Sequence, residues 1–354
     1  MNNIGYIILS NTPSLNSIEV ESGSTNYTSG SNYNAIIDIT TNTLLAGCKN
    51  TTIPNDVLHI GDNAFFGCNE LTDISLPTSL LTIGQQAFYN CTSLNGIHIP
   101  ASLNSIGDCA FYNCSSINDI TVESGNSKFD SRENCNAIIE TATNTLMAGC
   151  QNTIIPNSVT RIGDRAFAGC SSLKTIKTEA TTPPNLGSDV FPANLRIIYI
   201  PNNTLSAYQQ AWGNEYTYIN NENSLNLHVE TPGTLLDLIY NAGMHPMNVA
   251  KLTLTGTLND DDFACMRETM TSLVDVDLSG ITNTSGVDFG HSHKTNLVRV
   301  VLPANLMSIG KDAFAGCSSL VFVTIGNSVT SIGDGAFAGC SFLTSINIPN
   351  SVTS

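Results

Sequence analysis

Apolar and polar positions along this chain follow a pattern that recurs every 23 residues. Residues 69–91 read N-E-L-T-D-I-S-L-P-T-S-L-L-T-I-G-Q-Q-A-F-Y-N-C, and residues 92–114 repeat the pattern position by position. The matching apolar positions are Leu71 and Leu94, Ile74 and Ile97, Leu76 and Ile99, Ile83 and Ile106, and Phe88 and Phe111. Such a repeat predicts a solenoid, because one coil cannot bury its apolar face alone and must pack on its neighbours.

Each part of the repeat predicts a local structure. The L-x-x-L-x-L part is typical of leucine-rich repeats and predicts a short strand whose Leu and Ile side chains face inward. The pair Ile83-Gly84 predicts the start of an outer segment, with Gly84 in a tight turn or at positive φ. The A-F-x-G/N-C ending predicts a Phe and a Cys in the core of each coil. We therefore expect a mainly β, mixed repeat solenoid: leucine-rich repeat arrays of 23-residue coils with short strands on the concave face.

A longer repeat of 102 residues lies on top of the short one, relating residues 15–68 to residues 117–170. N-A-I-I-D at Asn34 matches N-A-I-I-E at Asn136, and T-N-T-L-L-A-G-C at residues 41–48 matches T-N-T-L-M-A-G-C at residues 143–150. Two apolar runs around a turn-rich linker predict a β-hairpin. We expect one hairpin-extended coil in each copy.

The pattern changes after Cys170 and predicts a small cap on the open end of the first array. Residues 196–201 read as a last strand, and residues 206–212 as a short helix with Ser206 at its N-cap. Four aromatic residues gather here: Tyr199, Tyr208, Trp212 and Tyr216. Packing of the cap is the favoured interpretation of this group, and a platform for a glycan is the alternative.

We expect two arrays in the chain. The first array with its cap covers residues 1–219, residues 220–224 form a linker, residues 225–297 form a helix-containing N-terminal cap, and residues 298–354 form a truncated second array. Helices are predicted at residues 234–240 and 260–270, and strands at residues 251–256 and 273–279. Both ends of the chain fall inside a repeat, so we expect a fragment of a longer protein, with head-to-tail self-contact through the partial coils as one consequence.

Composition narrows the classes of partner. The 354 residues carry a net charge of −16 with only 13 Lys and Arg, and no basic cluster occurs, so we expect no nucleic-acid partner. No run of 18 apolar residues occurs, so we expect no membrane insertion. No Lys or Arg precedes the apolar run at residues 4–9 and no small-residue cleavage site follows it, so we expect no signal peptide in this chain.

The repeats resemble a known family. L-T-S-I-N-I-P-N-S-V-T-S at residues 343–354 and S-I-G-D-G-A-F-A-G-C-S at residues 331–341 are similar to the BspA-like, or Treponema pallidum-type, leucine-rich repeats. The stretch from T-T-P-P-N-L-G to W-G-N resembles the C-terminal unit often seen in that family. This resemblance implies a curved solenoid on a bacterial cell-surface or secreted protein. It also implies a role in binding host matrix proteins, fibronectin and fibrinogen among them, or other bacteria, and it brings no catalytic residues.

The cysteines form a column rather than a metal-binding motif. Cys68, Cys91 and Cys114 are 23 residues apart, as are Cys317 and Cys340. The spacing of neighbouring coils permits a disulfide, but side chains that point the same way disfavour its torsion angle. Reduced, buried, structural cysteines are therefore the favoured interpretation, and the total of eleven leaves at least one thiol free in any intramolecular scheme.

Two other groups suggest a metal only weakly. His291 and His293 form an H-x-H pair without a further ligand nearby, so a solvated loop is favoured. Asp260, Asp261 and Asp262 lack the ligand spacing of a calcium loop and are typical of a helix N-terminus. No catalytic or nucleotide-binding motif occurs. We expect no enzyme, no cofactor and no metal.

Binding is therefore expected on the concave strand face. The candidate positions alternate with the buried ones and are Ser17, Glu19, Glu21, Asp73, Ser75, His98, Asp119, Thr121, Glu123, Asn152, Thr175, Lys177 and Glu179. This polar, mildly acidic surface suits a basic or extended protein segment. We expect a non-catalytic interaction or adhesion module whose partner is a host or bacterial surface protein of the extracellular-matrix type. A structural spacer that presents another domain and a glycan-binding module are the alternatives.

Overall fold

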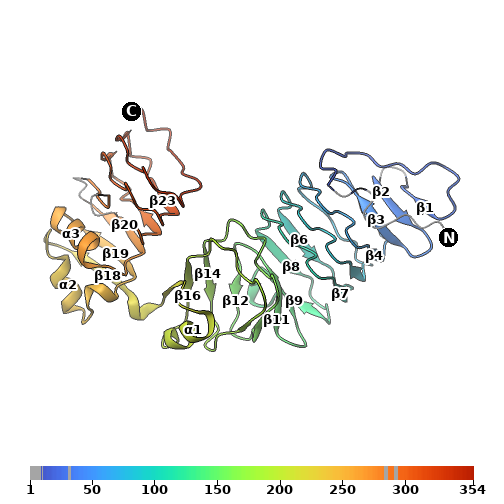
Figure 1. The fold of residues 1–354 in the computed structure, drawn as a ribbon, viewed down its shortest axis with the longest axis horizontal. Helices are drawn as coiled ribbons and strands as arrows, with labels where there is room; N and C mark the ends of the chain where they lie inside the picture. The colour runs from blue at the N-terminus through green and yellow to red at the C-terminus, as the bar shows by residue number, and fades with distance from the viewer. Residues whose placement is uncertain (1–8, 10, 31–32, 283–285, 291–293) are drawn as a thin grey trace. The chain divides into compact units, whose positions relative to one another are not determined.

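The computed structural model describes residues 9, 11–30, 33–282, 286–290 and 294–354, which fall into two compact units (Figure 1). The first unit is residues 1–216 and the second is residues 217–354. Residues 220–224, predicted as a linker, hold the short 3-10 helix η2 (Asn221–Asn223) and the first residue of β18 in the second unit. That the two units are independent domains stays a prediction.

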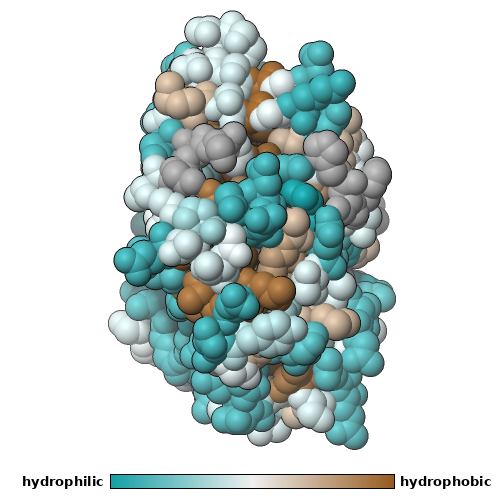
Figure 2. Space-filling view, turned by 90° about the vertical axis from the view of Figure 1, so that its left-hand side faces the viewer, coloured by the Kyte–Doolittle hydropathy of each residue, from teal (hydrophilic) through white to brown (hydrophobic). Residues whose placement is uncertain are grey.

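Polar residues cover most of the face that Figure 2 shows, and hydrophobic residues reach it only in small separate groups. This agrees with a chain in which 12% of residues are charged and most large apolar side chains lie in the core. Among the residues that the structure describes, no helix has both the length and the apolar character that crossing a membrane requires.

Both predicted hairpins of the first unit are confirmed. Their strands are β2 (Ala35–Asp38) with β3 (Thr43–Gly47), and β10 (Ala137–Glu140) with β11 (Thr145–Gly149), each pair antiparallel. The shorter strands β1 (Tyr27–Thr28) and β9 (Phe129–Asp130) add to β2 and β10, and η1 (Arg132–Asn134) follows β9. The register shifts at the same place in both hairpins, between Ile36 and Ile37 and between Ile138 and Ile139. The 102-residue repeat is thus a repeat of structure as well as of sequence.

A parallel ladder of two-residue strands continues from each hairpin. The strands are β4 (His59–Ile60), β5 (Thr82–Ile83) and β7 (Ser105–Ile106) after β3, and β13 (Arg161–Ile162) and β15 (Asn185–Leu186) after β11. Ile60, Ile83, Ile106 and Ile162, each followed by a Gly, therefore end strands of this second ladder.

Of the two alternatives predicted for Gly84, the tight turn is the one observed: its carbonyl accepts the backbone N–H of Ala87 at 3.4 Å, and its φ is not positive. A Cβ atom on Gly84 would lie 2.6 Å from the backbone N of Asp62 in the preceding coil, so glycine is needed for close approach of two backbones. Positive φ occurs two residues later in each coil, at 54° for Gln86 and for Cys109.

The L-x-x-L-x-L segments form a separate set of parallel strands, in two groups. One group is β6 (Gly96–Ile99) with β8 (Asp119–Val122), and the other is β12 (Ile154–Ile155), β14 (Thr175–Thr178) and β16 (Ile197–Tyr199). Residues 71–76 form no assigned strand, although Leu71 and Ile74 are buried and Asn95 donates its backbone N–H to the Thr72 carbonyl at 3.1 Å.

Aromatic rings and thiols fill the core of the first unit, as predicted. Phe65 stacks on Phe88 and Phe88 on Phe111, with ring centroids 5.0 and 5.6 Å apart. All eleven cysteines are free thiols, and only Cys109 and Cys170 are half-buried rather than buried. Burial raises the pKa of the Cys68 and Cys114 thiols to about 12. The column of reduced structural cysteines is confirmed.

The cap of the first unit contains α1 (Leu205–Trp212), and β17 (Thr217–Ile219) follows it in the second unit. The predicted N-cap was wrong by two residues: Thr204 holds the N-cap position and Ser206 lies inside the helix. Thr204 Oγ1 donates to the carbonyl of Pro201 at 2.6 Å, so this hydroxyl ties the helix to the preceding turn instead of capping it.

The second unit is a parallel sheet covered by helices. Its main strands, in sheet order, are β18 (Ser224–Val229), β19 (Lys251–Gly256), β20 (Asp275–Ile281), β21 (Arg299–Val301) and β23 (Phe322–Thr324). A second parallel pair is β22 (Ser308–Ile309) with β24 (Ser331–Ile332). The helical elements are α2 (Leu235–Asn241), η3 (Pro246–Asn248), α3 (Asp260–Ala264) and the π-helical turn η4 (Cys265–Thr269).

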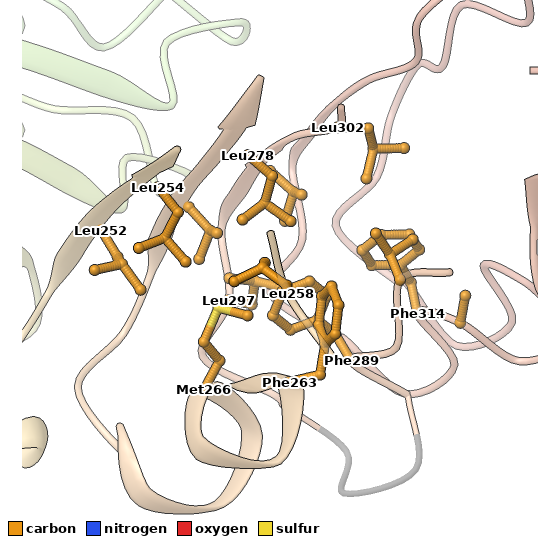
Figure 3. Close-up of a cluster of buried hydrophobic side chains, with 14 of the residues drawn as sticks. Leu252, Leu254, Leu258, Phe263, Met266, Leu278, Phe289, Leu297, Leu302 and Phe314 are labelled. Carbon is orange, nitrogen blue, oxygen red and sulfur yellow. The ribbon is translucent and has the colours of Figure 1, made fainter. Parts of the chain in front are cut away.

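Leucines from β19 and β20 meet the helices in the core of the second unit (Figure 3). Leu252, Leu254 and Leu278 point from the strands toward Phe263 of α3 and Met266 of η4. The predicted helix over residues 260–270 is therefore present, but only its first five residues are α-helical.

A lysine lies among these apolar side chains. Lys294 is 4% exposed and its ammonium group donates to the Met270 carbonyl. Burial lowers the pKa of Lys294 from the ordinary 10.5 to about 8. The charged lysine is therefore a cost to the folded state below pH 8 and ceases to be one once the lysine is neutral.

We expect the wild-type chain to gain roughly 3 kcal/mol of unfolding free energy relative to Lys294→Met between pH 7 and about pH 10. Between the folded and unfolded pKa of Lys294 the unfolded state binds more protons, so stability rises with pH. Urea denaturation of both proteins at a series of pH values measures the difference. Both proteins keep the cysteines, so the thiols of the unfolded chain titrate in both, and parallel pH curves would show that the folded state does not lower the lysine pKa.

Two glycines at one repeat position of the second unit give a matched test of coil stacking. A Cβ atom on Gly333 would lie 2.6 Å from the Lys311 backbone N, whereas a Cβ on Gly310 has no atom within 4 Å. We expect Gly333→Ala to lower the unfolding free energy by about 1–3 kcal/mol and Gly310→Ala to change it by less than about 0.5 kcal/mol. Urea denaturation measures the unfolding free energy of both variants. Equal losses for the two variants would contradict close stacking as the reason for the glycine at position 333.

Candidate interaction surface

The strands β6 and β8 form the first part of the predicted binding face. Gly96 pairs with Asp119 and His98 with Thr121 in this parallel register. His98 Nδ1 lies 2.7 Å from Thr121 Oγ1, so these two side chains form a hydrogen bond from coil to coil. The same His–Thr contact occurs between His59 and Thr82 at 2.8 Å in the second ladder of strands. A His–Thr pair is therefore a recurring coil contact rather than a feature of this face alone.

Most predicted site residues are accessible. Exposed side chains are Ser17, Glu19, Glu21, Asp73, Ser75, His98, Asp119, Asn152, Lys177 and Glu179, and half-buried ones are Thr121, Glu123 and Thr175. Only five of them lie on assigned strands, namely His98 on β6, Asp119 and Thr121 on β8, and Thr175 and Lys177 on β14. The segments that carry Ser17, Glu19, Glu21, Asp73 and Ser75 form no assigned strand.

Some of these side chains hold coils together. Glu123 accepts a hydrogen bond from the Ala101 backbone N–H at 2.9 Å. Asn152 donates its side-chain amide to the Asn118 carbonyl at 3.0 Å, as Asn50 does to the Asn16 carbonyl in the first copy of the long repeat. Glu123 and Asn152 thus have a structural role that their strand position did not reveal.

A shallow depression of about 390 Å³ lies over β12, β14 and β16. The strand register places Ile154, Lys177 and Tyr199 in one row across the three strands. Ile154 occupies an outward position and is 39% exposed, and Thr175 and Asn152 complete the rim. The depression therefore combines two apolar side chains, Ile154 and Tyr199, with Lys177 between them and polar edges.

The charges beside this depression are accessible. Lys177 and Glu179 form an ion pair at 3.0 Å with about half of each side chain exposed. An exposed pair of this kind contributes little to folding, because water screens it and the side chains lose freedom. Both charged groups are available to pair with a partner.

The sequence analysis missed the depression because it needed two facts that a repeat pattern does not give. Tyr199 was assigned to the cap, although it lies in register with Lys177. Ile154 occupies an outward position, but a single apolar residue at such a position carries no signal of its own. The row across three coils is visible only once the register is known.

The cap aromatics pack inside the first unit. Tyr208 and Trp212 are 0% and 4% exposed, and their rings meet edge to face with centroids 4.9 Å apart. Tyr208 donates its hydroxyl to the Ala180 carbonyl at 2.7 Å, and Trp212 donates Nε1–H to the Pro184 carbonyl at 2.8 Å. Two of the four proposed platform residues are thus inaccessible to a glycan.

The acidic run of the second unit caps a helix. Asp262 is 1% exposed and accepts backbone hydrogen bonds from Gly233, Leu235 and Asn259 at 2.8 to 3.0 Å. His291 and His293 lie outside the described residues. Within the ranges that are described, no cluster of three or more His, Cys, Asp or Glu side chains is arranged to hold a metal ion.

Comparisons with known proteins agree with the repeat pattern. The family profile described as BspA type Leucine rich repeat region (6 copies) matches residues 42–148, 146–228 and 289–354. None of the curated proteins is significantly similar to the chain.

Several solved structures are similar to the chain at low identity. A leucine rich cell surface protein from Faecalibacterium prausnitzii is 23% identical, with 85% of this chain and 59% of that chain covered and a TM-score of 0.32. A leucine-rich repeat protein from Eubacterium ventriosum is 19% identical, with 85% and 73% covered and a TM-score of 0.35. The leucine rich repeat protein of T. pallidum is 18% identical, with 92% and 91% covered and a TM-score of 0.16.

The chain spans 59% of the length of the first of these proteins. Family membership rests on the repeat match, which includes more than half of the residues and both units. The stacked Phe rings and the buried Cys column give that match its physical basis. The chain belongs to the BspA type leucine-rich repeat family.

Proposed function

We propose that the chain is a non-catalytic protein-interaction module of a bacterial surface or secreted protein, and that it binds a protein ligand through the strand face of its first unit. The observation that carries this proposal is the depression over β12, β14 and β16, formed by Asn152, Ile154, Thr175, Lys177 and Tyr199. Surface placement is supported by membership of the BspA type repeat family, whose resemblance implies surface or secreted proteins.

The depression has the composition of a binding site for a protein segment. Ile154 and Tyr199 offer apolar area on either side of Lys177, and tyrosine is enriched at protein interfaces. Lys177 and Glu179 stand beside them as charges of both signs. An extended segment with one apolar anchor and flanking charges fits this arrangement.

Acidic residues at the other strands favour a basic flank on the partner. Asp73 and Asp119 are exposed on either side of Gly96, which has no side chain to fill the space between them. Opposite charges across an interface raise the association rate and fix the register of binding. A partner of the extracellular-matrix type, or another bacterial surface protein, is the class we propose.

The non-catalytic part of the proposal is supported by how the polar residues are used. His98 bonds to Thr121 and Glu123 to the Ala101 backbone, so each serves coil contacts. Neither is paired with an acid or base as general acid–base catalysis requires.

We expect Ile154→Asp to weaken binding of an immobilised matrix protein at least about tenfold, which corresponds to about 1.4 kcal/mol. The reason is that a carboxylate at this apolar position must be desolvated on binding. Fibronectin, fibrinogen and a glycan array form the panel, and surface plasmon resonance gives the affinity of each hit.

Ile39→Asp is the matched control, because Ile39 is also an exposed isoleucine, at 46% against 39% for Ile154, and lies outside the face.

A double variant Asp73→Lys and Asp119→Lys tests the acidic part and should slow association. Equal affinities for Ile154→Asp and Ile39→Asp would reject the strand face. A complete absence of hits would favour a structural spacer, and hits confined to glycans would favour a sugar-binding module.

A further inference from the structure

Consecutive coils of the first unit are joined by hydrogen bonds of one polarity. The turns after Ile60-Gly61 and Ile83-Gly84 donate backbone N–H groups forward to carbonyls of the next coil. Asn63 and Phe65 donate to Gln85 and Ala87 at 2.9 and 2.7 Å, and Gln86 and Phe88 donate to Asp108 and Ala110 at 3.0 and 2.8 Å. Each turn therefore presents donors on one side and acceptors on the other.

This chain of bonds stops at the turn of residues 107–114. Among the described residues, the backbone N–H groups of Cys109 and Phe111 donate to no carbonyl and no side chain. The equivalent acceptor in the following regular coil would be the Ala166 carbonyl, which instead accepts from Gly149 of the hairpin strand β11 at 3.0 Å. Gly149 thus occupies the carbonyl that would correspond to the acceptor for Phe111, and the Cys109 N–H has no acceptor among the described residues either.

A cavity of about 270 Å³ lies at this interruption. Cys109 and Phe111 line it, and its apolar wall includes Ile117, Ile138 and Ala148. Phe111 is half-buried, whereas Phe88 and Phe167 at the same repeat position are fully buried. Part of the Phe111 ring therefore faces the cavity instead of a neighbouring ring.

Positive charge stands at the rim of the cavity. The Arg165 guanidinium lies 3.8 Å from Cys109 Sγ, and its only carboxylate partner in the described chain is the exposed Asp189 at 3.9 Å. Arg161 pairs with Asp164, whose Oδ1 also accepts the Ser188 N–H at 2.9 Å. Asp108 is the other acidic residue on the rim.

Backbone geometry favours an anion at the two donors. Cys109 has a φ of 54° and Asn113 a φ of 58°, and the N–H groups alternate along the turn. Those of Ala110 and Tyr112 donate within the turn, to the Gly107 and Cys109 carbonyls, whereas those of Cys109 and Phe111 do not. Such an arrangement forms an anion-binding concavity. Gly169 packs on the Asn113 backbone and closes one end, since a Cβ there would lie 2.0 Å from the Asn113 N.

We propose that this cavity binds a small amphiphilic carboxylate. The carboxylate accepts hydrogen bonds from the Cys109 and Phe111 N–H groups beside Arg165, and the apolar body lies against Phe111, Ile117 and Ile138. A cavity of 150 Å³ accommodates benzene, so 270 Å³ suits a ligand of about a dozen non-hydrogen atoms. This site is separate from the strand face and does not depend on the function proposed for it.

Isothermal titration calorimetry of the full chain with 1-naphthoate and with neutral 1-naphthamide tests the proposal. We expect saturable one-to-one binding of naphthoate and at least about tenfold weaker binding of the amide, because a charge-assisted hydrogen bond is lost. Arg165→Gln should weaken naphthoate binding, whereas Lys128→Gln, the same change of charge at an exposed residue that does not line the cavity, should leave it unchanged.

Ala148→Phe fills the cavity and should abolish binding while the near-ultraviolet circular dichroism of the chain is retained. If Ala148→Phe fails to fold, the comparison of naphthoate with naphthamide and of Arg165→Gln with Lys128→Gln still decides. Absence of saturable naphthoate binding, or equal affinity for the acid and the amide, would overturn the proposal. Loss of matrix-protein binding has no bearing on this result, so the two proposals fail separately.

Discussion

Direct backbone contact between successive coils is the constraint on which the rest of this structure depends. Glycines such as Gly84 and Gly107 bring the backbone of one coil against that of the coil before it, at distances where a Cβ atom would clash. The forward hydrogen bonds of the outer turns and the stacked Phe rings require this close approach. Because every coil packs on its neighbours, the contacts between successive coils stabilise the whole array.

Close stacking also decides what the surface can do. Outward side chains repeat every coil, so they form columns and rows rather than isolated groups. Several of them are used to bond coils to one another, as His98 and Thr121 show. The positions left for a partner are those whose side chains extend beyond these contacts, such as Ile154, Lys177 and Glu179.

The hairpin of β10 and β11 interrupts the regular coils of the first unit in two places. It separates the β6–β8 strand pair from the β12–β14–β16 group, which divides the strand face into an acidic part and a part with an apolar depression. It also removes the acceptor that the turn of residues 107–114 would otherwise meet. A single inserted element thus gives a regular solenoid two irregular places, and both proposed sites lie at them.

The sequence by itself determined the coil length, the apolar core positions, the Phe and Cys columns and both hairpins, because each follows from a pattern repeated within the chain. Tertiary structure alone decided why Gly84 is a glycine, where the helix after Thr204 begins, and which outward residues meet in one row. These depend on the register between coils and on the backbone path at an interruption. The register is set by contacts between residues 20 or more positions apart, whereas the start of the helix depends on the turn at residues 201–204, and the repeat pattern gives neither.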